Sequence, residues 1–431
     1  MCYNNLKYDF DRRLNMVKFS DTKRSEPLWQ RLRDKTCPEF VSAMRGLYSI
    51  YDADLPEWFA SLYDKEIGGF YYSPSARDNK TVVFKDKTYD LLPDIESTWQ
   101  ALDFVKNSGI AEGYNDAYLD FIPKPMQKKL HDFAYDMQDP DGYFYHKQWG
   151  KDITVSRRGR DLGSGRGVIK VFCGTPKYTS VIDSGPKSEE TLVPDHLTSR
   201  SKFIDYLDSL DIPNQSYHAG NTLSSQFGQI NRCGLTDVCI KYLNELQHPD
   251  TGHWHTETNY YAINGLMKIT VFYKNAKVLI PNAKKGAFAA IDAISSDEPC
   301  TAITQIWNTW YAARNIISTM RLFGEEGNGI ANEILAELHR VSAPALIKTA
   351  EKTLPMKKPG SSFSYGIDYP CIVSQGSPVC IPHLPEGDIN ATVMASHMMT
   401  NVVFTALELG EYEIPLYGKE EGRAFLGIVN S

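Results

Sequence analysis

The sequence of 431 residues lacks the features that mark several common classes of protein. No apolar run reaches the roughly 18 residues needed to cross a bilayer, and the N-terminus has no apolar stretch typical of a secretory signal. Basic residues are not in excess, since the net charge is −7 and the pI is near 5.8. Nucleic acids and anionic membranes favour a basic face on their partners. We therefore expect a cytoplasmic protein that binds neither nucleic acid nor a membrane.

Sequence motifs for bound cofactors and metals are also missing. No Gly-x-Gly-x-x-Gly follows an expected strand, and the eight scattered cysteines have no Cys-x-x-Cys spacing. Reduced thiols in a cytoplasm are the simplest interpretation. His253, His255 and Glu257 alternate and would share one face of an extended segment, but they lack a fourth ligand. We expect no metal and no cofactor, and we interpret these side chains as part of a sugar-binding surface.

Three segments repeat one pattern, in which an acidic glycine turn follows an amphipathic helix and leads into aromatic residues. They are Tyr63–Tyr72, Phe133–His146 and Leu246–Ile269. Proline presets a turn angle, aspartate bonds its own backbone, and glycine accepts a left-handed conformation. Recurrence at unequal spacing predicts helical hairpins with insertions of variable length. Behind the first turn, Phe70–Tyr72 and Thr81–Phe84 are expected to pair as a small β-hairpin.

The organisation predicted from these patterns is a single all-α domain. Apolar residues between the turns follow helical periodicity, and no Pro- or Ser-rich linker divides the chain. We predict a lead-in over residues 1–37 and one domain over residues 38–431. An irregular insertion is expected around residues 150–198, because its glycines and prolines favour a loop, and a further loop region around residues 355–387.

Repeated helical hairpins with such turns resemble the α/α-toroid families, which include six-hairpin glycoside hydrolases, toroid polysaccharide lyases and sugar epimerases. The segment Gln138–Phe144 is also similar to the turn motifs of terpenoid cyclases and protein prenyltransferases. The Asp-x-Asp-Asp acid of terpenoid cyclases is absent, and the zinc ligands of prenyltransferases have no match. The resemblance, over residues 40–410, implies an (α/α) toroid of about six helical hairpins. It also makes carboxylates at the N-termini of inner helices candidates for catalysis.

Four carboxylates are candidates for glycoside hydrolysis, which needs one carboxylic acid and one carboxylate. Asp94 and Glu96 lie in the first turn of a helix that begins near Pro93, and one of them would supply one member of the pair. We expect only one of the two to face the cavity, because residues i and i+2 point to different sides of a helix. Asp388 or Glu257 would supply the other member. The acids at helix starts equally fit a structural role, in which they complement the helix dipole.

The function predicted first is a glycoside hydrolase acting on oligosaccharides, because an acidic chain suits neutral sugars. Aromatic faces stack on the C–H groups of pyranoses, so the rings behind the second and third turns are expected to rim the site. These residues are Tyr145, His146, His253, Trp254, His255, Tyr260 and Tyr261. Trp307 and Trp310 lie about one helical turn apart and fit a buried core better.

A polysaccharide or oligosaccharide lyase is the first alternative. Asn221 would mask a uronate charge while His218 or Tyr260 removes a proton, with Gln226 as a further polar contact and Arg157 as a bidentate clamp. Helix capping and a solvated basic loop explain the same residues without a ligand. A sugar epimerase, a terpenoid cyclase-like enzyme and a non-catalytic helical scaffold are the remaining alternatives.

Overall fold

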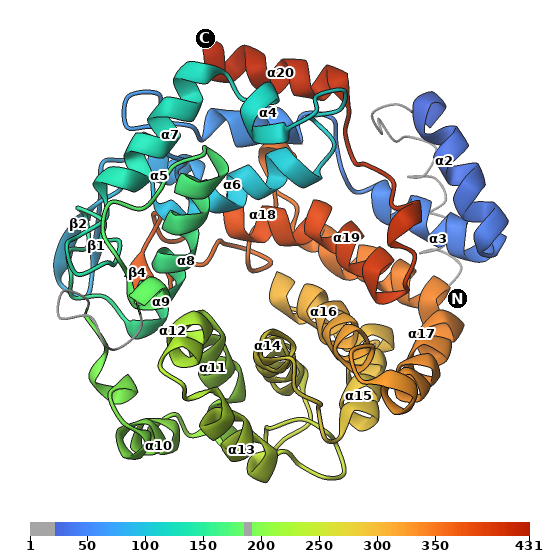
Figure 1. Ribbon diagram of the computed structural model, residues 1–431. Coiled ribbons are helices and arrows are strands. Elements are labelled where there is room, and N and C mark those ends of the chain that lie inside the picture. The colour runs from blue at the N-terminus through green and yellow to red at the C-terminus, as the bar shows by residue number, and fades with distance from the viewer. Residues whose placement is uncertain (1–21, 185–191) are drawn as a thin grey trace.

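The computed structural model describes residues 22–184 and 192–431, and helices make up most of this part of the chain (Figure 1). The strands in it are short and form two separate hairpins. The predicted all-α class is confirmed. The beginning of the expected lead-in, residues 1–21, lies outside the described residues. In the two described ranges, every helix is too short or too polar to traverse a lipid bilayer.

Six helices form a closed series around the middle of the molecule (Figure 1). They are α6 Ile95–Asn107, α8 Val155–Val171, α11 Ile212–Ser225, α14 Tyr260–Ala276, α16 Ile303–Met320 and α18 Ile389–Ala395. Each packs against the next in this order, and α18 packs back against α6. Inward-facing side chains of these helices therefore converge on one central space.

The other α-helices of the described residues are not members of this series. They are α2 Thr22–Lys35, α3 Pro38–Tyr48, α4 Leu55–Ser61, α5 Pro74–Asp78, α7 Lys124–Asp136, α9 Val181–Ser184, α10 Arg200–Ser209, α12 Phe227–Arg232, α13 Thr236–Leu246, α15 Ala283–Ser295, α17 Gly324–Thr353, α19 His397–Ala406 and α20 Lys419–Asn430. Helix α7 packs on α8, α15 on α14 and α16, α19 on α16, and the long α17 on α15, α16 and α3.

The three acidic glycine turns form as predicted. Gly68, Gly142 and Gly252 have φ values of 91°, 89° and 71°, in the left-handed region that glycine adopts without steric cost. In the second and third turns, a glutamine near the end of the preceding helix donates to the glycine carbonyl. Gln138 Nε2 lies 3.1 Å from the oxygen of Gly142, and Gln247 Nε2 lies 2.8 Å from that of Gly252. These bonds fix each turn to its helix.

The predicted pairing of the first β-hairpin is wrong. Strand β1, Thr81–Phe84, pairs antiparallel with β2, Lys87–Asp90, and not with Phe70–Tyr72. The two residues between the strands have φ values of 48° and 62°, which suit a two-residue turn that matches the twist of the strands. Phe70 is fully buried and makes single β-bridges to Tyr63 and Asp94 instead.

The insertion expected around residues 150–198 is not irregular in its first part, because α8 occupies it. Its glycines mark close packing and not turns. A Cβ at Gly159 would lie 2.5 Å from a carbonyl oxygen of α11, and a Cβ at Gly165 would lie 2.5 Å from the ring of Phe144. The basic residues of this segment are therefore carried by a helix of the central series.

The loop region expected around residues 355–387 contains a second hairpin. Strand β3, Val373–Ser374, pairs antiparallel with β4, Ser377–Pro378. Gln375 and Gly376 form the turn, with φ values of 51° and 91°. The hydroxyl of Thr154, which precedes α8, donates to the carbonyl of Gln375 at 2.7 Å. This bond places the hairpin at one end of the central space.

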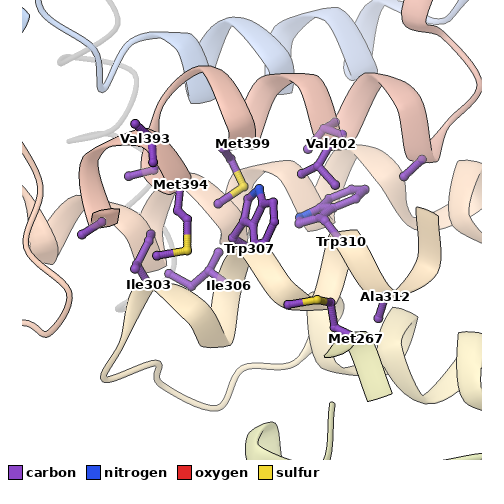
Figure 2. Packing of buried hydrophobic residues seen from close by; sticks show 14 of the residues in the cluster. Met267, Ile303, Ile306, Trp307, Trp310, Ala312, Val393, Met394, Met399 and Val402 are labelled. Carbon is purple, nitrogen blue, oxygen red and sulfur yellow. The ribbon is translucent and has the colours of Figure 1, made fainter. Parts of the chain in front are cut away.

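The core around α16 accounts for the two neighbouring tryptophans. Figure 2 shows Trp307 and Trp310 among apolar side chains that include Met267 of α14 and Met399 of α19. Trp310 is fully buried, and its Nε1 donates to the hydroxyl of Thr349 at 2.9 Å. The predicted core role is confirmed for both, and Trp307 additionally borders the central pocket.

Candidate functional site

A polar pocket of about 120 Å³ lies between the inner helices. It is lined by Tyr72, Arg160, Tyr217, Asn221, Lys268, Thr304, Trp307, Asn308, Tyr365, Cys371, Val373, Ser374, Gln375, Asn390 and Met394. These residues come from α8, α11, α14, α16 and α18, and from loops that include the β3–β4 hairpin. The lining formed by the described residues contains no aspartate or glutamate. Pockets for drug-sized ligands span roughly 300–1,000 Å³, so this one suits a single small ring or a short chain.

Arg160 forms a charged wall of the pocket and is held in a fixed orientation. Its Nη1 lies 2.6 Å from Oε1 of Glu96, and its Nη2 donates to Oδ1 of Asn221 at 2.8 Å. Asn221 donates in turn to Oε1 of Gln375 at 2.7 Å. A guanidinium has five N–H donors. Arg160 therefore retains donors with which it can bind an anionic or hydroxyl-bearing ligand.

A buried ion network lies behind this wall. Arg157, which is 0% exposed, bonds Asp161 at 2.9 Å, Asp94 at 3.0 Å and Glu96 at 3.2 Å. Its guanidinium carbon also lies 4.3 Å from the ring centroid of Trp149. Asp94 and Glu96 thus share one partner, contrary to the expectation that they face different sides. Arg157 is therefore an internal anchor rather than a clamp on a solvated loop, because three carboxylates compensate its charge.

Glu96 is held as an anion. Burial acts to raise its pKa, but the charges of Arg160 and Arg157 and the hydrogen bond from Ser374 outweigh burial and lower the pKa to about 2. Asp94 is the N-cap of α6 and accepts bonds from the amide and hydroxyl of Ser97 at 3.0 and 2.6 Å. Glu96 therefore orients the two arginines, and Asp94 orients Arg157 and caps the start of α6.

Lys268 presents an amine to the pocket from the middle of α14. In the described part of the chain, its Nζ has no hydrogen bond or ion pair with another residue. Burial, together with the nearby charge of Arg160, lowers the pKa of Lys268 to about 7, against the opposing effect of Glu96. A large fraction of the amine is therefore uncharged at neutral pH, with a free lone pair.

Hydroxyl groups form another part of the pocket lining. Tyr365 Oη lies 3.2 Å from the hydroxyl of Thr304, and a hydrogen bond links Tyr365 to Tyr217. Burial raises the pKa of both tyrosines. They therefore stay protonated at neutral pH and act as hydrogen-bond and proton donors. Asn308, held by Asn264 at 3.0 Å, adds a fixed amide.

The other two predicted carboxylates lie outside the pocket lining. Asp388 is the N-cap of α18 and accepts bonds from the amides of Ala391 and Tyr365 at 2.8 and 2.9 Å. Burial raises its pKa to about 7. Glu257 is exposed, and its Oε2 accepts a bond from Asn259 at 3.2 Å. The sequence predicted helix-start positions for Asp94 and Asp388 correctly, but the structure places neither in the pocket.

Several residues of the predicted rim have structural roles, because the turns direct them into the core. Trp254 is 1% exposed and donates to the carbonyl of Leu243 at 2.8 Å. His253 is also buried, and burial with two neighbouring histidines lowers its pKa to about 4. His146 accepts a bond from the amide of Ile95 at 2.9 Å.

Two further rim tyrosines lie away from the pocket. Tyr145 donates to Asp141 at 2.9 Å within its own turn. Tyr260 donates to the carbonyl of Glu298 at 2.9 Å and borders a separate surface groove. Neither lines the central pocket.

Two rim residues lie next to the pocket without lining it. The ring of Tyr261 is perpendicular to that of Tyr217, and their centroids are 5.7 Å apart. The ring centroid of His255 lies 5.3 Å from that of Tyr261. This row of rings connects the loop before α14 to a pocket-lining side chain. Tyr261 and His255 are thus the two predicted rim residues that approach the site.

The predicted lyase residues separate in the structure. Asn221 lines the pocket, whereas His218 is exposed. Gln226 is buried and bonds Tyr206 at 2.8 Å and His196 at 2.7 Å. His218 is exposed on α11, and Gln226 is the C-cap residue of that helix; both fall outside the pocket lining.

The pocket residues that sequence reasoning missed include Lys268, Asn308 and Tyr365. Lys268 is the one lysine inside the apolar run from Ile263 to Val271. A lone charge within such a run was the available signal, because it must either point away from the core or serve a buried site. Nothing in the local pattern around Tyr365 indicates its place, which depends on the long loop before α18.

Among the residues that the structure describes, no group of three or more His, Cys, Asp or Glu side chains is arranged to hold a metal ion. Comparisons with protein-family models, with curated proteins and with solved structures gave no match.

Proposed function

We propose that the protein is a carbohydrate-active enzyme with (α/α)-toroid architecture, and that the central pocket eliminates a group from an acidic sugar. The closed series of six inner helices supports the toroid. The observation that carries the function is the convergence of Arg160, Asn221, Lys268 and Tyr217 on a pocket whose lining, over the described residues, has no carboxylate.

An acidic sugar fits this set of groups. Arg160 and Asn221 would bind the sugar carboxylate through charge-assisted and amide hydrogen bonds. Neutralising that carboxylate makes the neighbouring C–H more acidic, which is what elimination requires. Tyr217, Tyr365 and Lys268 are the groups that can move protons in the lining. A sugar epimerase would use the same first step and is separated from a lyase by its product.

Glycoside hydrolysis is the second candidate. It needs two carboxyl groups at the scissile bond, whereas Glu96 and Asp94 are bonded to arginines behind the pocket wall. One observation favours it: burial raises the pKa of Asp388 to about 7, as a general acid would need. The elimination proposal is preferred because Asp388 lies outside the pocket lining.

An assay on a library of neutral and uronate-containing oligosaccharides tests the proposal. Elimination creates a conjugated double bond and ultraviolet absorbance, whereas hydrolysis releases reducing ends without it. We expect absorbance to grow with a uronate substrate, and Arg160→Gln to lower the rate by about 10²-fold or more. Arg166→Gln is the matched control, because Arg166 lies on the same helix but pairs with Asp183 near the surface.

Reducing ends without absorbance would favour hydrolysis. If no sugar binds to the protein or raises its melting temperature, the non-catalytic helical scaffold is favoured. A ligand that binds the native state would raise the stability of that state. The expected cytoplasmic location stays a prediction that cell fractionation tests.

A further inference from the structure

Lys268, which is partly buried, differs from Arg157 and Lys352 in having no hydrogen-bond or ion-pair partner among the described residues. Arg157 bonds three carboxylates, and Lys352 donates to the hydroxyl of Tyr260 and the carbonyl of Ser296 at 2.9 and 2.7 Å. In the described part of the chain, the Lys268 amine has neither a hydrogen bond nor an ion pair. Glu96, the acid whose charge acts on Lys268, is already bonded to Arg160, Arg157 and Ser374. An amine kept without a partner inside a polar pocket is available to a ligand.

The packing of α11 on α14 holds this amine in place. A Cβ at Gly220 would lie 2.8 Å from the Cβ of Lys268, so the absence of a side chain at Gly220 leaves room for the start of the lysine chain. On the same contact, a Cβ at Gly265 would lie 2.2 Å from the hydroxyl of Ser216. Two glycines facing each other's helix bring the helices close together and limit the directions that the lysine chain can take.

The amine is also the strongest nucleophile of the described lining at neutral pH. Burial raises the pKa of the Tyr72, Tyr217 and Tyr365 hydroxyls, so these remain protonated. Burial likewise raises the pKa of the Cys371 thiol, which donates to the carbonyl of Val373 at 3.0 Å. The pKa of Lys268 is lowered instead, so part of its amine is uncharged and nucleophilic at neutral pH. An uncharged amine attacks carbonyl carbons.

We propose that Lys268 forms an imine with the carbonyl group of a small oxo acid, such as the open-chain oxo form of a sugar acid, whose carboxylate binds Arg160. This inference rests on the proposed function in taking an acidic sugar as the substrate, and it adds covalent catalysis and a carbonyl group to that site.

The chemistry balances without an oxidant or reductant. The lone pair of Nζ forms a bond to the carbonyl carbon, and the π electrons move to oxygen, which takes a proton from a lining hydroxyl. The nitrogen loses a proton, and its lone pair then expels the hydroxyl, with a second proton, as water. The products are one imine and one water. The hydroxyls of Tyr217, Tyr365 and Thr304 face this space and can pass these protons.

Trapping with sodium borohydride tests the proposal on the full chain. Hydride reduces an imine to a stable secondary amine, whose position peptide mass spectrometry identifies. With pyruvate as the probe, we expect one adduct, on Lys268, in the wild-type protein. Acetone has the same carbonyl but no carboxylate. We expect half-maximal labelling with acetone to need a concentration roughly tenfold higher or more, since a hydrogen bond to a charged group is lost.

Lys268→Arg keeps a cation and should abolish the adduct. Lys274→Arg is the matched control, because Lys274 lies on the same helix, is half-buried and has its pKa lowered to about 8 by burial and by Arg314, yet lies outside the pocket lining. Its adduct on Lys268 should equal that of the wild type. Thermal melts establish that the variants are folded, and the mapping on wild-type protein does not depend on them.

Absence of an adduct on Lys268 in the wild type, or an equal adduct on Lys274 and surface lysines, overturns the inference. The outcome is separable from that of the proposed function. Trapping on Lys268 without elimination from any uronate would reject the proposed function alone. Elimination without trapping would reject the imine alone.

Discussion

The carboxylate of Glu96 lies 2.6 Å from the guanidinium of Arg160, at the contact between α6 and α8. The same carboxylate accepts a bond from Ser374 at 2.8 Å, so it joins two inner helices to the β3–β4 hairpin. Glu96 therefore positions the cation that we assign to the substrate and the hairpin that borders the pocket. Its chemistry is electrostatic, because two arginines hold it as an anion.

The first prediction concerns Glu96→Gln. The change leaves Arg160 and Arg157 with one negative charge fewer in a buried site, and breaking such a network costs about 3–5 kcal/mol. The depressed pKa of Glu96, about 2, against roughly 4.3 in an unfolded chain, adds a pH dependence. Its contribution to stability is complete above about pH 4.3 and is lost as the pH falls through about 2.

Urea unfolding between pH 2 and 7 measures both effects. The variant should be less stable at pH 7 and should lose less stability than the wild type on acidification. Asp183→Asn is the control, since its partner Arg166 is partly exposed and exposed pairs contribute about 0–1 kcal/mol. Equal losses in the two variants would mean that the Glu96 network is not a special anchor.

The second prediction is a pH dependence set by Lys268. Its pKa of about 7 in the folded protein lies below the roughly 10.4 of an unfolded chain. Between these values the unfolded state binds more protons, so stability rises with pH. Lys268→Met removes this partly buried charge. The variant should be more stable than the wild type by about 1–3 kcal/mol at pH 6, with the difference shrinking toward pH 10.

Denaturant midpoints measured from pH 6 to 10 give this difference directly. Lys274→Met, with a smaller lowering of the pKa to about 8, should show the same trend to a smaller extent. A constant difference for Lys268→Met across the range would contradict the prediction, because it would show that the amine is charged in the folded protein throughout.

Much of the fold could be predicted from the sequence because helical periodicity and glycine turns are local properties. Gly68, Gly142 and Gly252 identified their turns, since a positive φ there needs glycine. The α8 glycines misled the prediction, because Gly159 and Gly165 serve contacts with segments distant in the chain. Local composition cannot distinguish a glycine that permits a turn from one that permits close packing.

The candidate site was less predictable for the same reason. Asp94 and Glu96 stood out because they begin a helix, but their fate depends on Arg157 and Arg160, which come from a segment read as a loop. Lys268 is a single charge within an apolar run. Its role could be inferred only by knowing that five helices form a pocket around it. Convergence of distant segments is a property of the whole series of packed helices and not of any one motif.

The third prediction separates elimination from hydrolysis through Asp388. Its pKa of about 7 in the folded protein exceeds the roughly 3.9 of an unfolded chain. The folded state therefore binds more protons between these values, and stability falls as the pH rises through this window. Asp388→Asn mimics the protonated acid and keeps a good N-cap, so the fall between pH 4 and 7 should be reduced in the variant.

Activity of the same variant decides between the mechanisms. If Asp388 only caps α18, Asp388→Asn should retain activity within a few fold, whereas loss of a general acid would cost about 10²-fold or more. Asp388→Ala, which removes the cap, should lose about 1 kcal/mol of stability. A large loss of activity in the well-folded Asn variant would restore the hydrolase proposal.

The last prediction concerns the glycine that leaves room for Lys268. In Gly220→Ala, the new Cβ would lie 2.8 Å from the Cβ of Lys268 and 3.0 Å from a side-chain carbon of Ile269. The α11–α14 contact must open or the lysine must move. Overpacking of this kind costs about 1–3 kcal/mol, partly offset by the helix propensity of alanine, which is favourable by roughly 1 kcal/mol.

Borohydride trapping with pyruvate then reports on the lysine itself. We expect the yield of the Lys268 adduct to fall in Gly220→Ala while the protein stays folded. The displaced amine would no longer reach the carbonyl carbon of a pyruvate whose carboxylate is bound to Arg160. Gly163→Ala is the control, since a Cβ there has no neighbour within 4 Å, and it should be slightly more stable with an unchanged adduct. A full adduct in Gly220→Ala would show that the close packing of α11 on α14 does not position the amine. The other pocket-lining residues would then determine its reactivity.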